Sequence, residues 1–580
     1  MILKKGDTFC VKCEKTGSTV LEFAISELKK YLERLGLCEG ADGISFSVLE
    51  SDTLGSEGYE ITVTDTGVCI LGSGNGVLYG VYEFLEGCLG FCFGSYYETM
   101  PQKAHFEIEN GKIVKERASL PYRTVVPQFS CWAGNVDRAL TLDFIDWLGK
   151  NRYNRLLTWM SVYKQLCELG FIPELEKRGI KLTVGHHQAT YSFLPPEKYR
   201  RSNPEFFKLL SDGTRYDPTD YSGQLVLCSR NEQCIKTFSD NVIAWIRQNP
   251  IVDTIALWPN DFTEDYCQCD ECQKYTKMEN YLYFENEVAK RVRAVMPHVK
   301  IDVLIYTDLW QKPQSVTALD DGILIDQANW SKNDLRHIGR RDGGSLIGTD
   351  YDQNHKAFRK ICKNTVFYDY YMGNYNARQR MIPGADEMQA IFQYFEKEGV
   401  LGSGSQFECF NLWNNIFNFF CFARTQYDTS LSFEDCLARF SRLFGEGAED
   451  IQSIIRTLEN TLEGEVSIRY AGIYTIEHVD TDKIYSLFES ALSKTRSKNE
   501  RNNIRMLRMA FRYSHLITID ESEDNAKEPN VPTYVDKTGE LTIMAESFDS
   551  FGDEQNRSGI AIRVKNRGAQ KTDDIWYNLD

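Results

Sequence analysis

Between about residues 122 and 427 the chain alternates short apolar stretches with longer amphipathic ones. The longer stretches, for example 236–248, 285–296 and 388–398, carry apolar residues at helical spacing. Such alternation is typical of parallel strands connected by helices. Eight repeats over roughly 300 residues predict a closed (β/α)8 TIM barrel better than an open sheet. The predicted strands are 122–129, 154–159, 181–185, 254–258, 301–306, 323–326, 365–371 and 401–407.

The segments on either side of this region have other patterns. Helical spacing in 21–35 and 77–85, with alternating segments between them, predicts an N-terminal α/β accessory domain. Amphipathic stretches after the barrel predict a C-terminal helical domain, followed by a polar tail of unknown structure. The whole chain is therefore expected to be an α/β protein. Its predicted domains are 1–118 (accessory), 119–428 (catalytic barrel), 429–520 (helical) and 521–580 (tail).

Composition and charge narrow the possible partners. Hydrophobic residues make up 42% and charged residues 26%, as in ordinary globular proteins. A net charge of -17 disfavours nucleic acid and anionic membranes, whose binding needs clustered Lys and Arg. The absence of a long apolar run and of a leader-like N-terminal stretch, with 17 scattered cysteines, predicts a cytoplasmic protein. A neutral oligosaccharide or glycan fits as substrate, and no pattern indicates the oligomeric state.

Acids and aromatic residues follow five successive predicted strands. Barrel enzymes place their catalytic residues at these carboxyl ends. A single such acid is as often a helix cap, but five in succession favour a sugar site. Glycosidic cleavage needs an acid that protonates the leaving oxygen and a second group at the anomeric carbon. Asp261 and Glu408, from strands on opposite sides of the barrel, are the candidate pair. The candidate substrate-binding residues are Trp258, His186, Tyr306, Asp326, Trp330, Tyr368, Asp369, Tyr370 and Trp413.

Three cysteines, Cys267, Cys269 and Cys272, lie within six residues shortly after Asp261. They are candidates for a structural zinc site with a fourth ligand from elsewhere, or for free thiols or a disulfide with a spare thiol. In each case they would brace the loop behind Asp261. These cysteines are not expected to form a catalytic metal site, because barrel hydrolases usually bind a catalytic metal through His and carboxylates. No cofactor is expected for catalysis.

Several motifs resemble known families. The run 76–86, Gly-Val-Leu-Tyr-Gly-Val-Tyr-Glu-Phe-Leu-Glu, resembles the end of the domain that precedes the barrel in α-glucuronidases and β-hexosaminidases. Leu-Cys-Ser-Arg-Asn at 227–231, and Trp-Pro-Asn-Asp at 258–261 with its cysteines, resemble the family called domain of unknown function 4838. That grouping includes glycoside hydrolase family 163, which comprises endo-β-N-acetylglucosaminidases acting on N-glycans.

The resemblance implies a mechanism as well as a barrel. In related N-acetylhexosaminidases the substrate's own acetamido group attacks the anomeric carbon, so retention needs no protein nucleophile. By position, Asn260 and Asp261 would orient the acetamide and share the catalytic roles, and Glu408 would be the general acid/base. The missing export signal departs from an enzyme of host N-glycans and leaves exo-hydrolysis of imported oligosaccharides open.

Two other hypotheses stay open. An α-glucuronidase-like enzyme would need Arg or Lys near the pocket to bind the uronate, and Arg123 and Lys312 are weak candidates. A non-catalytic carbohydrate-binding barrel would keep the aromatic rim, but its acids would not cooperate.

Overall fold

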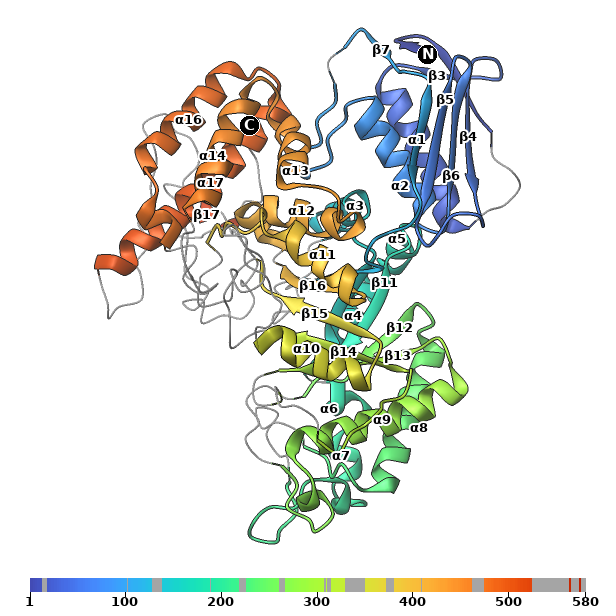
Figure 1. Ribbon diagram of the computed structural model, residues 1–580, viewed down its shortest axis with the longest axis vertical. Coiled ribbons are helices and arrows are strands. Elements are labelled where there is room, and N and C mark those ends of the chain that lie inside the picture. Colours follow the sequence, from blue (N-terminus) through green and yellow to red (C-terminus); the bar gives the residue numbers. More distant parts are fainter. Residues whose placement is uncertain are drawn as a thin grey trace.

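The protein is described by a computed structural model (Figure 1), which has a barrel at its centre and further elements at both ends. The residues that the structure describes are 1–12, 18–101, 103–127, 138–187, 189–217, 226–259, 266–306, 309, 314–328, 350–371, 380–407, 409–461, 474–523, 563–564 and 573–574.

The N-terminal part is a six-stranded sheet covered by two helices, α1 (Thr19–Arg34) and α2 (Gly76–Glu83) (Figure 1). Its strands are β2 (Thr8–Lys12), β3 (Cys38–Glu39), β4 (Ile44–Glu50), β5 (Tyr59–Thr64), β6 (Gly67–Gly72) and β8 (Gly111–Lys115). The order is β3-β2-β4-β6-β5-β8, in which only β5 pairs antiparallel with its neighbours. Two further strands, β1 (Ile2–Lys4) and β7 (His105–Glu107), pair with each other.

Eight parallel strands close into a barrel, which confirms the predicted fold class. They are β9 (Tyr122–Pro127), β10 (Arg155–Trp159), β11 (Lys181–Gly185), β12 (Val252–Ala256), β13 (Lys300–Ile305), β14 (Ile323–Ala328), β15 (Thr365–Asp369) and β16 (Gly402–Phe407). Each strand pairs with the next along the chain, and β16 pairs with β9 to close the circle. All eight predicted strands are present, although β12 begins two residues earlier than expected.

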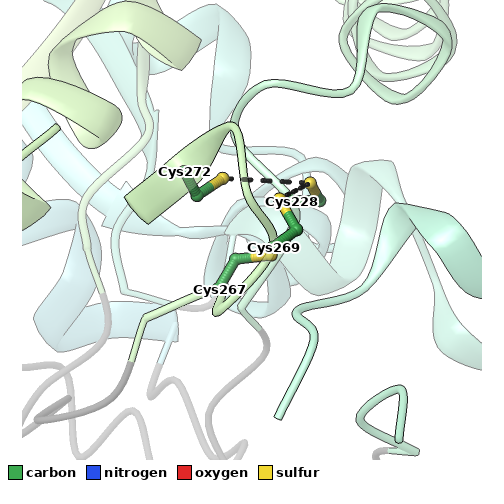
Figure 2. A group of neighbouring side chains, drawn as sticks. All are labelled: Cys228, Cys267, Cys269 and Cys272. Atoms are coloured by element: carbon green, nitrogen blue, oxygen red, sulfur yellow. Dashed lines mark hydrogen bonds between the residues drawn. The ribbon is translucent and has the colours of Figure 1, made fainter. Parts of the chain in front are cut away.

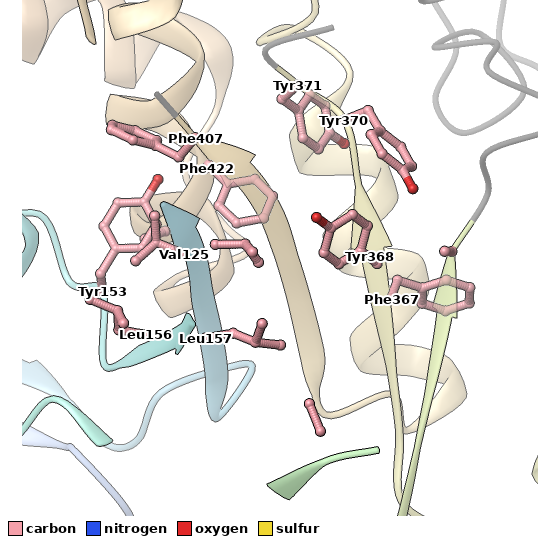
Figure 3. Close-up of a cluster of buried hydrophobic side chains, with 14 of the residues drawn as sticks. Val125, Tyr153, Leu156, Leu157, Phe367, Tyr368, Tyr370, Tyr371, Phe407 and Phe422 are labelled. Atoms are coloured by element: carbon pink, nitrogen blue, oxygen red, sulfur yellow. The ribbon is translucent and has the colours of Figure 1, made fainter. Parts of the chain in front are cut away.

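Helices surround the barrel, and their ends follow local sequence signals. Thr276 and Glu279 form a capping box at the start of α9, and α11 stops at Gly399, whose φ is 71°. Figure 3 shows part of the buried layer between strands and helices, with Tyr153, Phe407 and Phe422 among its side chains. The principal helices are α3 (Arg138–Lys150), α4 (Met160–Glu168), α8 (Glu232–Gln248), α9 (Lys277–Val295), α10 (Asp350–Ile361), α11 (Met388–Glu398) and α12 (Ile416–Tyr427).

The segment 186–232, between β11 and α8, contains short helices. These are α6 (Ala189–Phe193), α7 (Pro196–Tyr199) and a 3-10 turn (Pro204–Phe206). Their buried side chains explain the order of this segment, because Phe193 packs on Phe238 of α8 and Phe206 contacts Tyr199.

Among the residues that the structure describes, four α-helices follow the barrel (Figure 1). They are α13 (Phe433–Phe440), α14 (Ala448–Asn460), α16 (Thr481–Lys494) and α17 (Lys498–Glu523). Most of the predicted tail lies outside the described residues, which include the end of α17 and the paired strands β17 (Arg563–Val564) and β18 (Asp573–Asp574). Among the helices that the structure describes, none is long and apolar enough to cross a membrane.

Buried ion pairs join the N-terminal part to the barrel. Arg424 of α12 donates two hydrogen bonds to Glu86, at 2.8 and 2.9 Å, and both residues are 3% exposed. Arg123 near the start of β9 donates to Glu57 at 2.6 Å and to the backbone of Arg152 and Leu120. Because a buried charge without its partner costs several kcal/mol, these pairs hold the two parts in one relative position.

Candidate active site

Aromatic rings line the barrel interior at the carboxyl ends of its strands. His186, directly after β11, stacks on Trp159 at 4.0 Å between ring centroids and contacts Trp258 in a tilted arrangement at 4.4 Å. Trp258 also contacts Tyr368 of β15 at 5.3 Å, and Tyr368 contacts Tyr370 at 5.2 Å. These five residues, from four strands, form a continuous set that we call the aromatic cluster. Flat rings at a barrel mouth suit the apolar faces of sugar rings.

The backbone holds His186 in an unusual conformation. Its φ is 76°, in the left-handed region that side-chain-bearing residues seldom adopt. Gly185 makes this approach possible, because a Cβ there would lie 2.1 Å from the carbonyl oxygen of Ala256 on β12. Strain of this kind collects at functional sites.

The imidazole of His186 is buried and neutral. Burial, and then the neighbouring His187, hold the pKa of His186 well below its usual value. Neither ring nitrogen has a hydrogen-bond partner among the described residues. His187 continues the ring contacts to Tyr306, after β13, at 5.9 Å. A neutral imidazole offers one donor and one acceptor, which suits a sugar hydroxyl.

Two buried aspartates point into the same interior. Asp302 of β13 accepts a hydrogen bond from the indole Nε1 of Trp258 at 2.9 Å. Burial raises the pKa of Asp302 to about 7, even though the Trp258 hydrogen bond lowers it. Asp326 of β14 is fully buried, and burial and the charges of Asp302 and Asp369 raise its pKa well above the usual value. The site therefore holds carboxylic acids that keep their protons near neutral pH.

Asp369 lies on the other face of β15. Its carboxylate accepts a hydrogen bond from the Ser403 hydroxyl, and Phe367, two residues earlier, stacks on Phe395 of the outer helix α11 at 4.6 Å. Since alternate residues of a strand face opposite ways, Asp369 faces the helix layer and Tyr368 the interior. Burial raises the pKa of Asp369 to about 7. The structure thus does not bring Asp369 into the aromatic cluster.

A pocket opens beside the end of β12. Trp258 and Pro259 form one side of it. Glu285 of α9 lies in the wall, and burial raises its pKa well above the usual value. Its Oε2 has no hydrogen-bond partner among the described residues. The remaining lining residues are Thr190, Val226, Leu227, Ser229, Tyr266, Lys277, Tyr281, Phe284 and Leu309.

The other predicted site residues fall into two groups. Trp413 is described and is buried in the hydrophobic core. The remaining ones, Asn260, Asp261, Trp330 and Glu408, lie outside the described residues.

Arg123 does not support a uronate site at the mouth. It is the second residue of β9, at the end of the barrel away from the carboxyl ends, and it is fully buried against Glu57. Its charge is therefore already neutralised. Lys312, the other weak candidate, lies outside the described residues.

Sequence reasoning missed three residues of this region. Asp302 interrupts an apolar strand and shares the inward face with Leu304, so strand alternation could have identified it. Glu285 sits within a helical pattern that gives no sign of a pocket. Cys228, a residue of the quoted Leu-Cys-Ser-Arg-Asn motif, lies beside the three predicted cysteines.

Four cysteines form a group that could hold a metal ion (Figure 2). The sulfur atoms of Cys228, Cys267, Cys269 and Cys272 all lie within 4.8 Å of one another. Three of these side chains are buried, and that of Cys269 is half-buried.

Comparisons with known proteins place the chain in a family. It belongs to the family described as domain of unknown function DUF4838, whose model matches residues 92–455, from the end of the N-terminal part to the first C-terminal helices. The resemblance stated from the motifs is thereby confirmed. No curated protein matches the sequence.

Solved structures share the architecture at low identity. A GH138 enzyme targeting pectin rhamnogalacturonan II has a TM-score of 0.59 and 13% identity, covering 88% of this chain and 69% of its own. The protein CpGH84B has a TM-score of 0.54 and 13% identity, covering 90% of this chain and 88% of its own. At such identities the likeness is one of fold.

Proposed function

We propose that this protein is a glycoside hydrolase that cleaves β-linked N-acetylhexosamine in oligosaccharides or N-glycans. The observation that carries the proposal is the barrel mouth, where an aromatic cluster and a neutral His186 lie beside Asp302 and Asp326, two acids whose pKa values burial raises. Stacking surfaces bind the sugar ring, and acids with a raised pKa suit a reaction that begins with proton donation.

The proposed chemistry needs two carboxyl groups and the substrate itself. Glu408 protonates the leaving oxygen, and the acetamido oxygen attacks the anomeric carbon to form a cyclic intermediate, with retention of configuration. Asp261 and Asn260 hold the acetamide in position, and water then opens the intermediate while Glu408 accepts its proton. In this scheme Trp258, Tyr306, Tyr368 and Tyr370 contact the sugar, and no cofactor takes part.

The shared architecture supports glycosidase chemistry. The GH138 enzyme, which shares this fold, targets the pectic polysaccharide rhamnogalacturonan II. The specificity for acetamido sugars rests on the family resemblance of the 258–261 motif.

Two alternatives remain as outcomes of the test. An α-glucuronidase needs a cation at the mouth, and the pairing of Arg123 with Glu57 removes one of its two candidates. A non-catalytic sugar-binding barrel would use the same aromatic cluster without turnover.

The test is hydrolysis of aryl glycosides. We would measure kcat/KM on aryl β-N-acetylglucosaminide, β-N-acetylgalactosaminide and α-glucuronide and on one N-glycan, for wild type, Asp261→Asn and Glu408→Gln. Each variant should lose roughly 10²–10⁴-fold in kcat/KM, the usual contribution of an acid/base group.

The matched control is Asp240→Asn, which removes an exposed carboxylate on the outer helix α8. It should match wild type. Cleavage of the glucuronide alone would replace the proposed specificity. Sugar binding without turnover, or full activity in both variants, would show that the carboxylate assignment is wrong.

A further inference from the structure

Four thiols from two separate segments meet (Figure 2), and their chain neighbours Leu227, Ser229 and Tyr266 line the pocket. Cys228 precedes α8, and Cys267, Cys269 and Cys272 follow β12. The Sγ atom of Cys228 lies 3.6 Å from that of Cys269 and 3.9 Å from that of Cys272. These separations are far longer than the S–S bond of about 2.05 Å in a disulfide.

The separations match a tetrahedral metal site. Zinc–sulfur bonds of about 2.3 Å directed to the corners of a tetrahedron place the sulfur atoms about 3.8 Å apart. Four thiolates without an ion would repel one another in this buried place, whereas a divalent cation offsets their charge. Sulfur ligands alone also favour zinc over magnesium or calcium, which prefer oxygen.

Polar groups around the cysteines fix their positions. The backbone N–H of Leu209 donates to the Sγ of Cys267 at 3.3 Å, a bond that stabilises a thiolate. The Asn280 side chain donates to the carbonyl of Cys272 at 2.8 Å, and Gln273 donates to the carbonyl of Cys267. Such outer hydrogen bonds orient the ligands of metal sites.

We propose that Cys228, Cys267, Cys269 and Cys272 bind one zinc ion through four thiolates. Four protein ligands fill the tetrahedron, so the role of the ion is structural. The ion would lie beside the pocket, because Leu227, Ser229 and Tyr266, the chain neighbours of two ligands, line the pocket together with Trp258. The ion would tie the segment that enters α8 to the segment that leaves β12 and thereby hold two walls of the pocket together.

The test measures zinc in the full-length protein, reduced, free of any affinity tag, loaded with zinc and then desalted. Elemental analysis should find one zinc ion per chain in wild type and none in Cys228→Ser. Cys269→Ser, at the half-buried position, tests the same site with less risk to folding. The matched control is Cys234→Ser, a buried cysteine six residues from Cys228 and outside the group, which should keep the ion.

Two further readouts separate a specific site from loss of folding. Cobalt(II) in place of zinc should give the strong visible absorption of a tetrahedral thiolate complex in wild type and Cys234→Ser alone. A strong chelator should lower the melting temperature of those two proteins and leave Cys269→Ser unchanged. Zinc-free wild type after loading, a full ion in Cys269→Ser, or a mass showing disulfides among the four cysteines would overturn the proposal.

Discussion

At the residue scale, the site combines strain, burial and ring stacking in a few side chains. His186 has a left-handed φ and two buried nitrogens without a partner among the described residues, between Trp159 and Trp258. Each of these features costs free energy in the folded state. A bound sugar hydroxyl would offset part of that cost, so His186 is expected to contribute to binding more than to stability.

The first prediction concerns His186→Phe. Phenylalanine keeps a flat ring between the two tryptophans but removes the donor and the acceptor. We expect KM to rise roughly fivefold, which corresponds to one lost hydrogen bond of about 1 kcal/mol, with kcat little changed. Steady-state kinetics on the best aryl glycoside and the melting temperature check this. An unchanged KM in a folded variant would remove His186 from the substrate site.

Asp302 makes a pH-dependent contribution to stability whose sign follows from its raised pKa. An aspartate in the unfolded chain has a pKa of about 3.9, whereas burial raises the pKa of Asp302 to about 7. The folded state therefore binds this proton more tightly. Its stabilising contribution is complete below about pH 4 and is lost as the pH rises towards about 7.

The second prediction follows for Asp302→Asn, which cannot ionise and still accepts the hydrogen bond of Trp258. Between pH 5 and 7 the variant should gain stability over wild type by roughly 1 kcal/mol per pH unit. Urea unfolding at each pH measures the difference in free energy of unfolding.

Asp253→Asn is the control for this measurement. Burial raises the pKa of Asp253, but the charge and hydrogen bonds of Arg155, with the hydrogen bond of Thr254, together lower it more, so Asp253 is ionised throughout this range. Its substitution should cost the same at every pH from 5 to 7. If the difference in free energy of unfolding between Asp302→Asn and wild type were also the same at every pH from 5 to 7, Asp302 would be ionised in the folded protein.

At the element scale, hydrophobic patterning was sufficient for the barrel. Alternation of strand and helix patterns identified all eight strands, and α11 was predicted with its observed bounds. The short helices in 186–232 were missed because side-chain packing on α8, rather than periodicity, holds them. The site was predicted less completely. Asp326, Trp258 and His186 follow from strand ends, but Cys228 joins its partners only through folding.

Helix α9 begins with a capping box and carries residues that line the pocket. Glu279 completes the capping box with Thr276 and also accepts hydrogen bonds from the backbone and hydroxyl of Ser315, at 2.8 and 2.5 Å. The Ser315 hydroxyl bond is the main cause that lowers the pKa of Glu279 to about 2, so the carboxylate is charged at neutral pH. Tyr281 and Glu285 of the same helix line the pocket.

The third prediction compares two cap variants. Thr276→Ala removes the hydroxyl that accepts from the backbone N–H of Glu279 and donates to its carboxylate, and should cost about 1 kcal/mol in the free energy of unfolding. Glu279→Ala also leaves the Ser315 donors without their acceptor, so it should cost more, about 2–3 kcal/mol. Chemical denaturation of both variants beside wild type provides the measurement. Equal costs would mean that the Ser315 contacts contribute nothing to stability.

At the scale of the whole molecule, buried ion pairs connect the N-terminal sheet, the barrel and the first C-terminal helix. Arg424 pairs with Glu86, and Arg439 of α13 pairs with Glu83 at 3.0 and 3.1 Å. Arg152, which follows α3, lies 3.6 Å from Glu83. Glu83 and Glu86 of the N-terminal part thus pair with arginines of the barrel and of the first C-terminal helix. We therefore expect the three parts to unfold together.

The fourth prediction tests this coupling with Glu86→Gln. Glutamine keeps the shape but leaves the buried Arg424 without its counter-charge, which should cost about 3–5 kcal/mol. The exposed pair of Arg456 and Glu434 offers the control, and Glu434→Gln should cost less than about 1 kcal/mol.

Differential scanning calorimetry should show one transition over the elements from α1 to α17, shifted to lower temperature in Glu86→Gln alone. Two separate transitions in wild type, or equal shifts in both variants, would mean that these pairs do not couple the parts. If the single transition is found, the barrel mouth depends for its stability on contacts at the opposite end of the barrel, and substitutions there should weaken binding through unfolding rather than through the site.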